Sequence, residues 1–261
     1  MGVSYDTAAI LKDFSTRQGI TYPLIADPQS EVINRFGVLN ASATDFMKGM
    51  AIPGFVYVSV NGQVQQTFFE ENYRERATAN SVIASLFPEL AESGVRMVAA
   101  PHVQLRLSQS DLVVGPGNRL TLTVQLRLPK GLHVYAPGVQ GYKPIVLQLD
   151  ANPEVKLGPV QYPKSEVLFL PAIHERVPVF SGAFRIIQAV TVASNPDFTR
   201  TLRSAGDGAG KTITVTGTLF YQACDAVKCF LPDNVPVSWQ FQAVPLDLKR
   251  SPEAIRHSGD P

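Results

Sequence analysis

The two cysteines of this chain, Cys224 and Cys229, are separated by only four residues, and the other 259 positions hold no further cysteine. Exchange between thiols and disulfides needs an attacking thiolate and a second thiol that resolves the mixed disulfide. Two cysteines so close in sequence can bond to each other if the loop between them folds back. The pair therefore indicates thiol–disulfide exchange, with a structural disulfide as the alternative.

The structural alternative is the weaker of the two. A disulfide that closes a short loop restricts the unfolded chain less than one that joins distant segments. A domain with a sizeable core does not need such a short staple. If the disulfide were nevertheless structural, the protein would be a non-enzymatic interaction module that binds another protein.

Charged and aromatic residues next to the pair are candidates for tuning it. Lys228, beside the second cysteine, would stabilise a thiolate there, whereas Asp225, beside the first, would oppose one. The alternative is that both charges are simply solvated. Tyr221 and Phe230 flank the pair and are candidates for an apolar docking rim, or else for ordinary core or edge residues.

A metal centre is not expected. Structural zinc takes four ligands at characteristic spacings. The histidines show no such spacing, so each is predicted to be a surface residue or to have its hydrogen bonds satisfied; they are His102, His133, His174 and His257. The sequence implies neither a metal nor an organic cofactor.

Composition excludes several other classes of function. The net charge is +1 and no block of like charges occurs, which argues against a nucleic-acid groove or a patch that binds anionic lipids. No apolar run approaches the roughly 18 residues of a transmembrane helix. The first residues also lack the basic and apolar regions of a secretory signal peptide.

The first ninety residues predict the order α-β-α-β-β-α. Helical spacing of apolar residues alternates with short β-rich runs and turn residues. The expected elements are a helix capped by Asp6 and Thr7 and ended by Gly19, a strand at 21–25, a helix with Pro28 at its first position, strands 55–60 and 63–69 around the Asn61-Gly62 turn, and a helix at 77–87.

This segment, residues 1–90, resembles the C-terminal part of a peroxiredoxin (redoxin, AhpC/TSA-like) domain. The resemblance is carried by residues 2–6, 19–28 and 36–39, and by Ile52-Pro53-Gly54. It implies an incomplete thioredoxin-like fold, with Ile52–Pro53 at a position where such folds have a cis-proline. We expect a truncated domain with an exposed apolar face; the alternative is that a partner supplies the missing strands. The peroxidatic cysteine of the family has no counterpart here, so peroxiredoxin-type antioxidant activity is the least favoured function.

Residues 91–101 lack a sustained period and are predicted to be a linker. Beyond them, short strands with period two indicate an antiparallel β-sandwich over residues 102–247, with a disordered tail at 248–261. The expected strands are 103–107, 120–128, 132–135, 145–149, 184–192, 212–221 and 235–241. Both cysteines would lie on the loop between the last two, at the rim of the sandwich.

This second part resembles the N-terminal periplasmic domain of the thiol:disulfide interchange protein DsbD. The resemblance is carried by residues 131–137, 162–164 and 177–182, and most specifically by residues 219–232. It implies an immunoglobulin-like sandwich in an extracytoplasmic compartment, the periplasm, that exchanges electrons with a thioredoxin-like protein or domain. In that family a short cap loop with an aromatic residue shields the cysteines. The matching region, residues 167–175, contains Phe169 and His174.

Carried over to this sequence, the resemblance makes Cys229 the exchanging nucleophile and Cys224 its partner. The sequence therefore predicts an α+β multidomain chain. An incomplete thioredoxin-like α/β segment precedes an immunoglobulin-like antiparallel β-sandwich that carries a redox pair.

Overall fold

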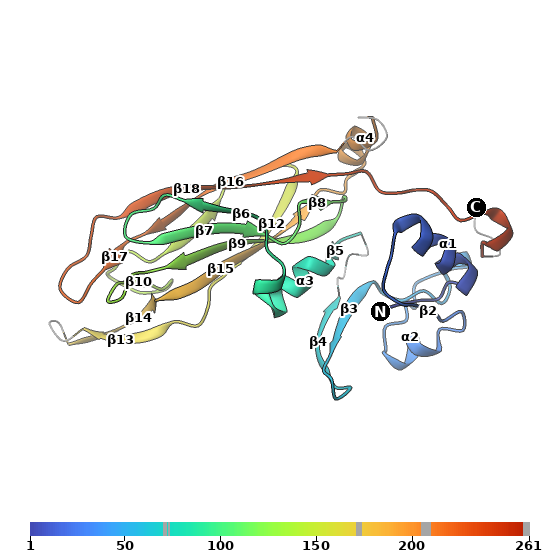
Figure 1. Cartoon of the computed structure of the whole chain (residues 1–261), viewed down its shortest axis with the longest axis horizontal. Coiled ribbons are helices and arrows are strands. Elements are labelled where there is room, and N and C mark those ends of the chain that lie inside the picture. The colour runs from blue at the N-terminus through green and yellow to red at the C-terminus, as the bar shows by residue number, and fades with distance from the viewer. Residues whose placement is uncertain (70–71, 73, 171–173, 205–209, 258–261) are drawn as a thin grey trace. The chain divides into compact units, whose positions relative to one another are not determined.

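A computed structural model describes residues 1–69, 72, 74–170, 174–204 and 210–257 (Figure 1). The chain folds into two compact units. Unit 1 comprises Met1–Tyr73 and Asp247–Pro261, and unit 2 comprises Arg74–Leu246. Unit 1 holds the redoxin-like segment, and unit 2 holds the β-rich part with both cysteines.

Unit 1 is a small α/β unit whose strands form two separate pairs. One pair is parallel and the other is an antiparallel hairpin, β1–β2 and β3–β4 respectively. Its elements are β1 (Gly2–Ser4), α1 (Ala8–Gln18), β2 (Leu24–Ala26), α2 (Glu31–Arg35), the 3₁₀ turn η1 (Asp45–Met47), β3 (Gly54–Val58), β4 (Val64–Phe69) and the C-terminal 3₁₀ turn η3 (Glu253–Ile255).

The ends of α1 follow the predicted signals. The Thr7 hydroxyl accepts a hydrogen bond from the Ile10 amide, and Gly19 ends the helix in the left-handed conformation with φ 62°. The start of α2 differs from the prediction. The carboxylate of Asp27 accepts hydrogen bonds from the amides of Glu31 and Ile33, both at 2.9 Å, so the helix begins after the turn that contains Pro28.

Unit 1 has a small core and an exposed apolar surface. Leu11 and Ile33 are its buried apolar residues among the described part of the chain. Val3, Phe14, Ile25, Phe36, Ile52, Phe55, Val58, Val64 and Phe69 are each more than a third exposed. Unit 1 therefore exposes many large apolar side chains, as expected of an incomplete thioredoxin-like domain. The Ile52–Pro53 bond is trans, so the suggested cis-proline is wrong; the trans form is the usual one before proline.

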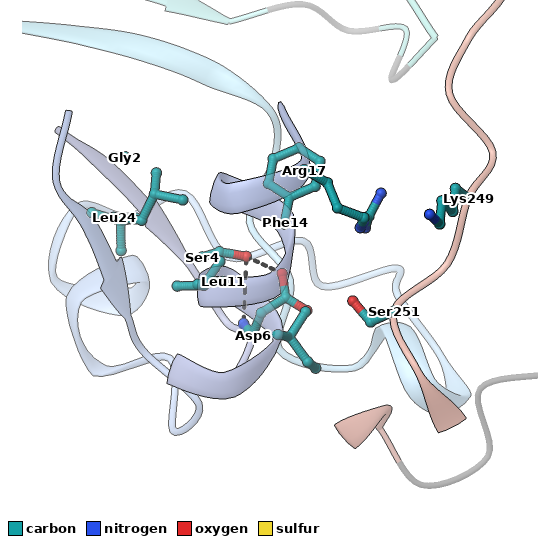
Figure 2. Close-up of a pocket in the computed structure, with 11 residues that line it drawn as sticks. Gly2, Ser4, Asp6, Leu11, Phe14, Arg17, Leu24, Lys249 and Ser251 are labelled. Atoms are coloured by element: carbon teal, nitrogen blue, oxygen red, sulfur yellow. Dashed lines mark hydrogen bonds between the residues drawn. The ribbon is translucent and has the colours of Figure 1, made fainter. Parts of the chain in front are cut away.

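The C-terminal segment packs within unit 1 and is not the disordered tail that we expected. Ser251 donates a hydrogen bond to Asp13 at 2.9 Å, and the His257 ring lies 2.8 Å from the Asp6 carboxylate. With α1 and β1 it encloses a hollow of about 330 Å³ (Figure 2). Polar contacts, which a composition-based estimate of disorder does not weigh, hold this segment; residues 258–261 lie outside the described part.

Unit 2 is an antiparallel β-sandwich with a third, smaller sheet at one end (Figure 1). One large sheet has the order β12 (Val155–Gln161), β15 (Ala183–Val192), β9 (Asn118–Arg127), β7 (Gln104–Gln109), β6 (Ser93–Val98), with β5 (Arg76–Ala77) beside β9. The other has the order β11 (Val146–Leu149), β16 (Lys211–Tyr221), β18 (Asp233–Ala243), β8 (Val113–Val114). The small sheet has the order β13 (Glu166–Leu170), β14 (Glu175–Ser181), β10 (His133–Tyr135), β17 (Ala223–Cys224).

The alternation that predicted the sandwich also builds its core. Leu120, Leu122, Val124 and Leu126 of β9 are fully buried, and Trp239 of β18 joins the same apolar cluster. Alternate residues of a strand point to opposite faces, so one side of each large sheet faces this cluster. The immunoglobulin-like sandwich predicted from the sequence is thus observed.

The boundary between the two parts lies earlier than predicted. The supposed linker at 91–101 contains β6, which pairs with β7. The helix α3 (Ala79–Leu86) belongs to unit 2, where its cap residue Thr78 donates a hydrogen bond to Asp111 at 2.6 Å. An edge strand and a short helix have weak periodicity and gain their stability from tertiary pairing, which a sequence pattern does not display. The helix α4 (Pro196–Ser204) and the short 3₁₀ turn η2 (Pro88–Leu90) were likewise not predicted.

Candidate redox site

A disulfide joins Cys224 and Cys229, with a Cα–Cα distance of 3.9 Å. The two residues form an isolated antiparallel bridge, so the loop between β16 and β18 folds back on itself as a tight hairpin. The predicted position of the pair on this loop, at an end of the sandwich, is confirmed (Figure 1). The short strand β17 within the loop was not predicted.

The two sulfur-bearing residues differ sharply in exposure. Cys224 is 1% exposed and belongs to a small apolar cluster with Tyr135, Val177 and Val179. Cys229 lies on the returning arm of the hairpin and is exposed. The difference follows from β17, which pairs with β10 and so fixes Cys224 within the small sheet. Of the two residues, Cys229 is therefore the more accessible to an approaching thiolate.

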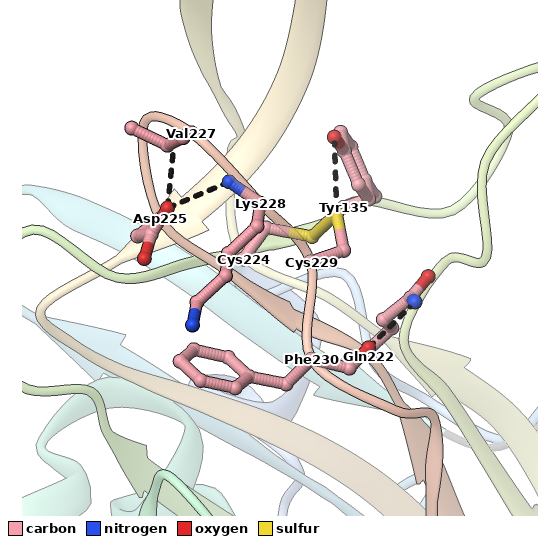
Figure 3. The surroundings of a disulfide bond; sticks show 8 residues. All are labelled: Tyr135, Gln222, Cys224, Asp225, Val227, Lys228, Cys229 and Phe230. Atoms are coloured by element: carbon pink, nitrogen blue, oxygen red, sulfur yellow. Dashed lines mark hydrogen bonds between the residues drawn. A yellow bond between two sulfur atoms is a disulfide. The ribbon is translucent and has the colours of Figure 1, made fainter.

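Asp225 shapes the hairpin. Its carboxylate accepts hydrogen bonds from the amides of Val227 and Lys228 at 2.7 and 2.8 Å, and its own amide donates to the Lys228 carbonyl at 2.9 Å (Figure 3). These backbone hydrogen bonds lower the pKa of Asp225 below its usual value. The residue singled out for its charge thus has an evident role in fixing the turn.

The Lys228 amine is directed toward an aromatic ring. Its Nζ lies 5.4 Å from the centroid of Phe230, and Figure 3 shows the Lys228 side chain reaching toward this ring. Phe230 also stacks on His102, with the ring centroids 3.9 Å apart. A cation over a ring face is a favourable contact, which provides Lys228 with a structural role besides the suggested effect on the Cys229 thiolate.

Of the two aromatic candidates for a docking rim, one is excluded. Tyr221 is 2% exposed, lies in the main core cluster, and donates a hydrogen bond to the Pro101 carbonyl at 2.7 Å. Its place on the inward-facing side of β16 explains this burial. Phe230 is half-buried beside the disulfide and remains available to such a rim.

Two tyrosines that sequence reasoning did not single out lie at the site. The Tyr135 hydroxyl is 4.0 Å from the Cys229 sulfur, and the Tyr135 ring stacks on Tyr142 at 4.3 Å between centroids. Tyr142 donates a hydrogen bond to Glu175 at 2.6 Å, which raises the pKa of Tyr142 to about 12. Burial first, and then the charge of Glu175, raises the pKa of Tyr135. For Tyr135 the available signal was the run at 131–137 already quoted for the resemblance, and Tyr142 lies outside that run.

The region predicted to contain the cap loop forms the β13–β14 hairpin, whose residues 171–173 lie outside the described part. Alternate residues of β13 face opposite sides. Leu168 and Leu170 pack against the cluster that contains Cys224, so Phe169, between them, points to the other face. There it is 48% exposed and lies 6.4 Å from the exposed ring of His174. Phe169 therefore faces away from the pair, and leucines and tyrosines occupy the side toward it.

The histidines differ from one another more than predicted. His102 and His174 are exposed, and His257 is bonded to Asp6, as expected of surface or satisfied residues. His133 is 5% exposed and its Nε2 has no hydrogen-bond partner among the described residues, so the expectation is wrong for this one. Its position at the start of β10 buries it. Burial lowers the pKa of His133, and the nearby Asp225 carboxylate opposes this shift.

Within the ranges that the structure describes, no group of three or more His, Cys, Asp and Glu side chains is arranged to hold a metal ion. Within the same ranges, no helix is both long and apolar enough to span a membrane.

The comparison with protein families decides the kind of domain. The family model for the N-terminal domain of the thiol:disulfide interchange protein DsbD matches residues 104–238, which is more than half of the 261-residue chain. The chain belongs to this family. The matched range runs from β7 into β18 and includes both cysteines of the DsbD N-terminal domain described here.

A second family model, the AhpC/TSA family, matches residues 1–67 in unit 1. Both resemblances predicted from the sequence are thereby confirmed. No curated protein matches the chain.

Several solved structures resemble the chain, and two of them illustrate the match. One is the N-terminal domain of DsbD from Neisseria meningitidis in the reduced form, with 18% identity and a TM-score of 0.29 over 61% of this chain and 97% of that one. The other is the N-terminal periplasmic domain of ScsB from Proteus mirabilis, with 12% identity and a TM-score of 0.34 over 63% of this chain and 54% of that one.

Proposed function

We propose that this DsbD N-terminal family member exchanges its Cys224–Cys229 disulfide with the dithiol of a thioredoxin-like protein in an extracytoplasmic compartment. The observation that carries the proposal is the unequal exposure of the two bonded cysteines. Exchange needs one accessible sulfur to be attacked and a second that leaves and later resolves the mixed disulfide. Cys229 has the first role and Cys224 the second.

The surface around Cys229 suits a protein partner. Val227 and Leu231 are 94% and 85% exposed on either side of it, and Phe230 is half-buried beside it. Exposed apolar side chains around a reactive group are typical of a docking surface. The adjacent charged residues of the hairpin, Lys228 and Asp225, make contacts within the hairpin itself.

Single-cysteine variants test the proposal. With purified thioredoxin carrying one active-site cysteine, Cys224→Ser is expected to form a mixed disulfide through the exposed Cys229. Cys229→Ser is expected to form far less, because its remaining thiol is buried. The double variant is the matched control and should trap none. Equal trapping by both single variants would contradict the roles assigned to the two cysteines.

The reduction potential tests the same proposal independently. Working exchange pairs have potentials of roughly −120 to −270 mV. A value below about −300 mV would mark a structural disulfide and support the binding-module alternative. The hairpin has hydrogen bonds of its own, which argue against a need for such a staple. The Asp225 carboxylate accepts from two amides of the turn, and the Phe230 amide donates to the Ala223 carbonyl.

Peroxidase activity has no support in unit 1. The segment matched by the AhpC/TSA model contains no cysteine, because the chain has only two and both lie in unit 2. Peroxide turnover that survived in the double serine variant would overturn this conclusion.

A further inference from the structure

His133 lies in the same row of the small sheet as the buried cysteine. In the antiparallel register, His133 of β10 is directly opposite Cys224 of β17 on one side and Ser181 of β14 on the other. Side chains of directly opposed residues project from the same face, with Cβ atoms about 4.5–5.5 Å apart. The imidazole therefore neighbours the Cys224 side chain.

The unpaired nitrogen of His133 suggests a partner that the oxidised site does not offer. The residue is 5% exposed, and its Nε2 makes no hydrogen bond to any described residue. Buried polar atoms normally have a partner, because an unpaired one is costly. The sulfur of Cys224 has no proton to donate while it is in the disulfide. Reduction would turn it into a thiol or thiolate, either of which can bond to an imidazole.

Cys224 needs such help in order to leave. It is 1% exposed and packs against Tyr135, Val177 and Val179. An apolar site disfavours a bare thiolate and raises the pKa of the thiol. A leaving thiol of high pKa departs slowly in exchange. A proton donor next to the sulfur would remove this obstacle.

We propose that His133 is the proton donor and acceptor for the Cys224 sulfur; this rests on the exchange function proposed above. When a partner thiolate attacks Cys229, a new S–S bond forms to it as the Cys224–Cys229 bond breaks, and the electron pair goes to the Cys224 sulfur. Protonated His133 gives its proton to that sulfur and becomes neutral.

The remaining steps balance the exchange. The partner's second thiolate attacks the partner's own sulfur in the mixed disulfide and expels Cys229 as a thiolate, which takes a proton from water. The partner is then oxidised to a disulfide and the cysteine pair is reduced to two thiols. In the opposite direction, Cys229 as a thiolate attacks an acceptor disulfide. Neutral His133 then takes the proton of Cys224, which attacks Cys229 and releases the reduced acceptor.

Among the described residues, the other ionisable groups near this row are a phenol and carboxylates, including Glu175, whose charge acts on Tyr135. Tyr135 lies two residues along β10 with its ring edge-on to His133, Asp225 follows β17, and Glu166 of β13 accepts a hydrogen bond from Ser181 at 3.2 Å. Carboxyl and phenol groups ordinarily titrate below about pH 5 and above about pH 9. Imidazoles titrate between these limits, and His102 also stacks on Phe230 beside Cys229. A change in exchange rate is therefore assigned to His133 only where His133→Gln abolishes it.

The test measures the rate at which glutathione reduces the oxidised protein between about pH 5 and pH 8. Each rate is divided by the concentration of glutathione thiolate at that pH. For the wild-type protein we expect this normalised rate constant to fall about tenfold as pH rises and His133 loses its proton. For His133→Gln it should be low and independent of pH. His257→Gln, which removes an imidazole in unit 1, is the matched control and should behave as wild type.

The outcomes separate this inference from the proposed function. If wild type is reduced readily but His133→Gln shows the same pH profile, the role of His133 is refuted and exchange stands. If glutathione and thioredoxin both fail to reduce the wild-type disulfide, both proposals fall. Should His133→Gln not fold, NMR titration of the wild-type histidines decides. The proposal requires the His133 titration midpoint to be higher in the reduced than in the oxidised protein, and an unchanged midpoint refutes it.

Discussion

Replacing both cysteines with serine is expected to lower the free energy of unfolding of unit 2 by about 2 kcal/mol and to leave the fold intact. The disulfide joins residues with a sequence separation of only 5. The loop-closure relation gives about 2 kcal/mol at 25 °C for so short a loop. For a unit of this size, that corresponds to a decrease of about 4–8 °C in Tm.

The fold should survive because other interactions hold the hairpin and the core. The main apolar cluster of the sandwich contains neither cysteine. In the variant, β17 can still pair with β10, the Asp225 carboxylate can still accept its two amide hydrogen bonds, and Gln222 can still donate to the Phe230 carbonyl at 2.8 Å. Electron exchange, in contrast, should be abolished.

The assay follows the fluorescence of Trp239 during thermal and urea unfolding. It is the single tryptophan of the chain, is 3% exposed in β18, and so reports on unit 2 alone. Wild type with dithiothreitol is the matched control and should unfold like the double variant, which dithiothreitol should not affect. A loss above about 4 kcal/mol, or an unfolded signal at 25 °C, would refute the reasoning and mark the disulfide as a structural staple.

Three further predictions concern the surroundings of the pair. Glu175→Ala should lower the pKa of Tyr142 from about 12 toward the ordinary value of 10, because the acceptor that favours the protonated phenol is lost. Tyrosinate absorbance during an alkaline titration measures this pKa, and Tyr142→Phe identifies which part of the absorbance change belongs to Tyr142. A Tyr142 titration that did not shift would contradict the assignment. Asp225→Ala should lower the Tm at pH 7. Since hydrogen bonds lower the pKa of Asp225 below 3.8, its stabilisation is complete at neutral pH and is lost as pH falls through the lowered pKa; a Tm difference from wild type that persisted in stronger acid would count against this. Tyr221→Phe should lower the free energy of unfolding by about 1–3 kcal/mol, because it leaves the Pro101 carbonyl without its buried donor. Trp239 fluorescence during urea unfolding measures this change. A change near zero would mean that the hydrogen bond contributes little.

Local patterns were sufficient wherever a residue's role depends on its near neighbours in sequence. The alternation of Leu120, Leu122, Val124 and Leu126 predicted a strand with one buried face, because side chains alternate along any strand. Thr7 and Gly19 predicted the ends of α1, because caps act within one turn. The spacing of Cys224 and Cys229 permitted the disulfide that the structure contains.

Patterns were insufficient where a role depends on pairing between distant strands. The edge strand β6 and the hairpin β13–β14 carry weak signals of their own and are fixed by the neighbours they bond to. The same holds for the two tyrosines at the disulfide, which reach it from β10 and from the loop that follows it. Phe169 was assigned to the cap because it is aromatic, but the register of β13 turns it to the opposite face.

The sequence by itself therefore determined which residues could carry the chemistry, since only two thiols exist and they are close neighbours in the chain. The tertiary structure decided how they differ. Pairing of β17 with β10 buries Cys224, leaves Cys229 exposed and sets His133 opposite the buried sulfur. Burial and strand register are properties of contacts between segments some ninety residues apart, as His133 and Cys224 are, and no local pattern in either segment encodes them.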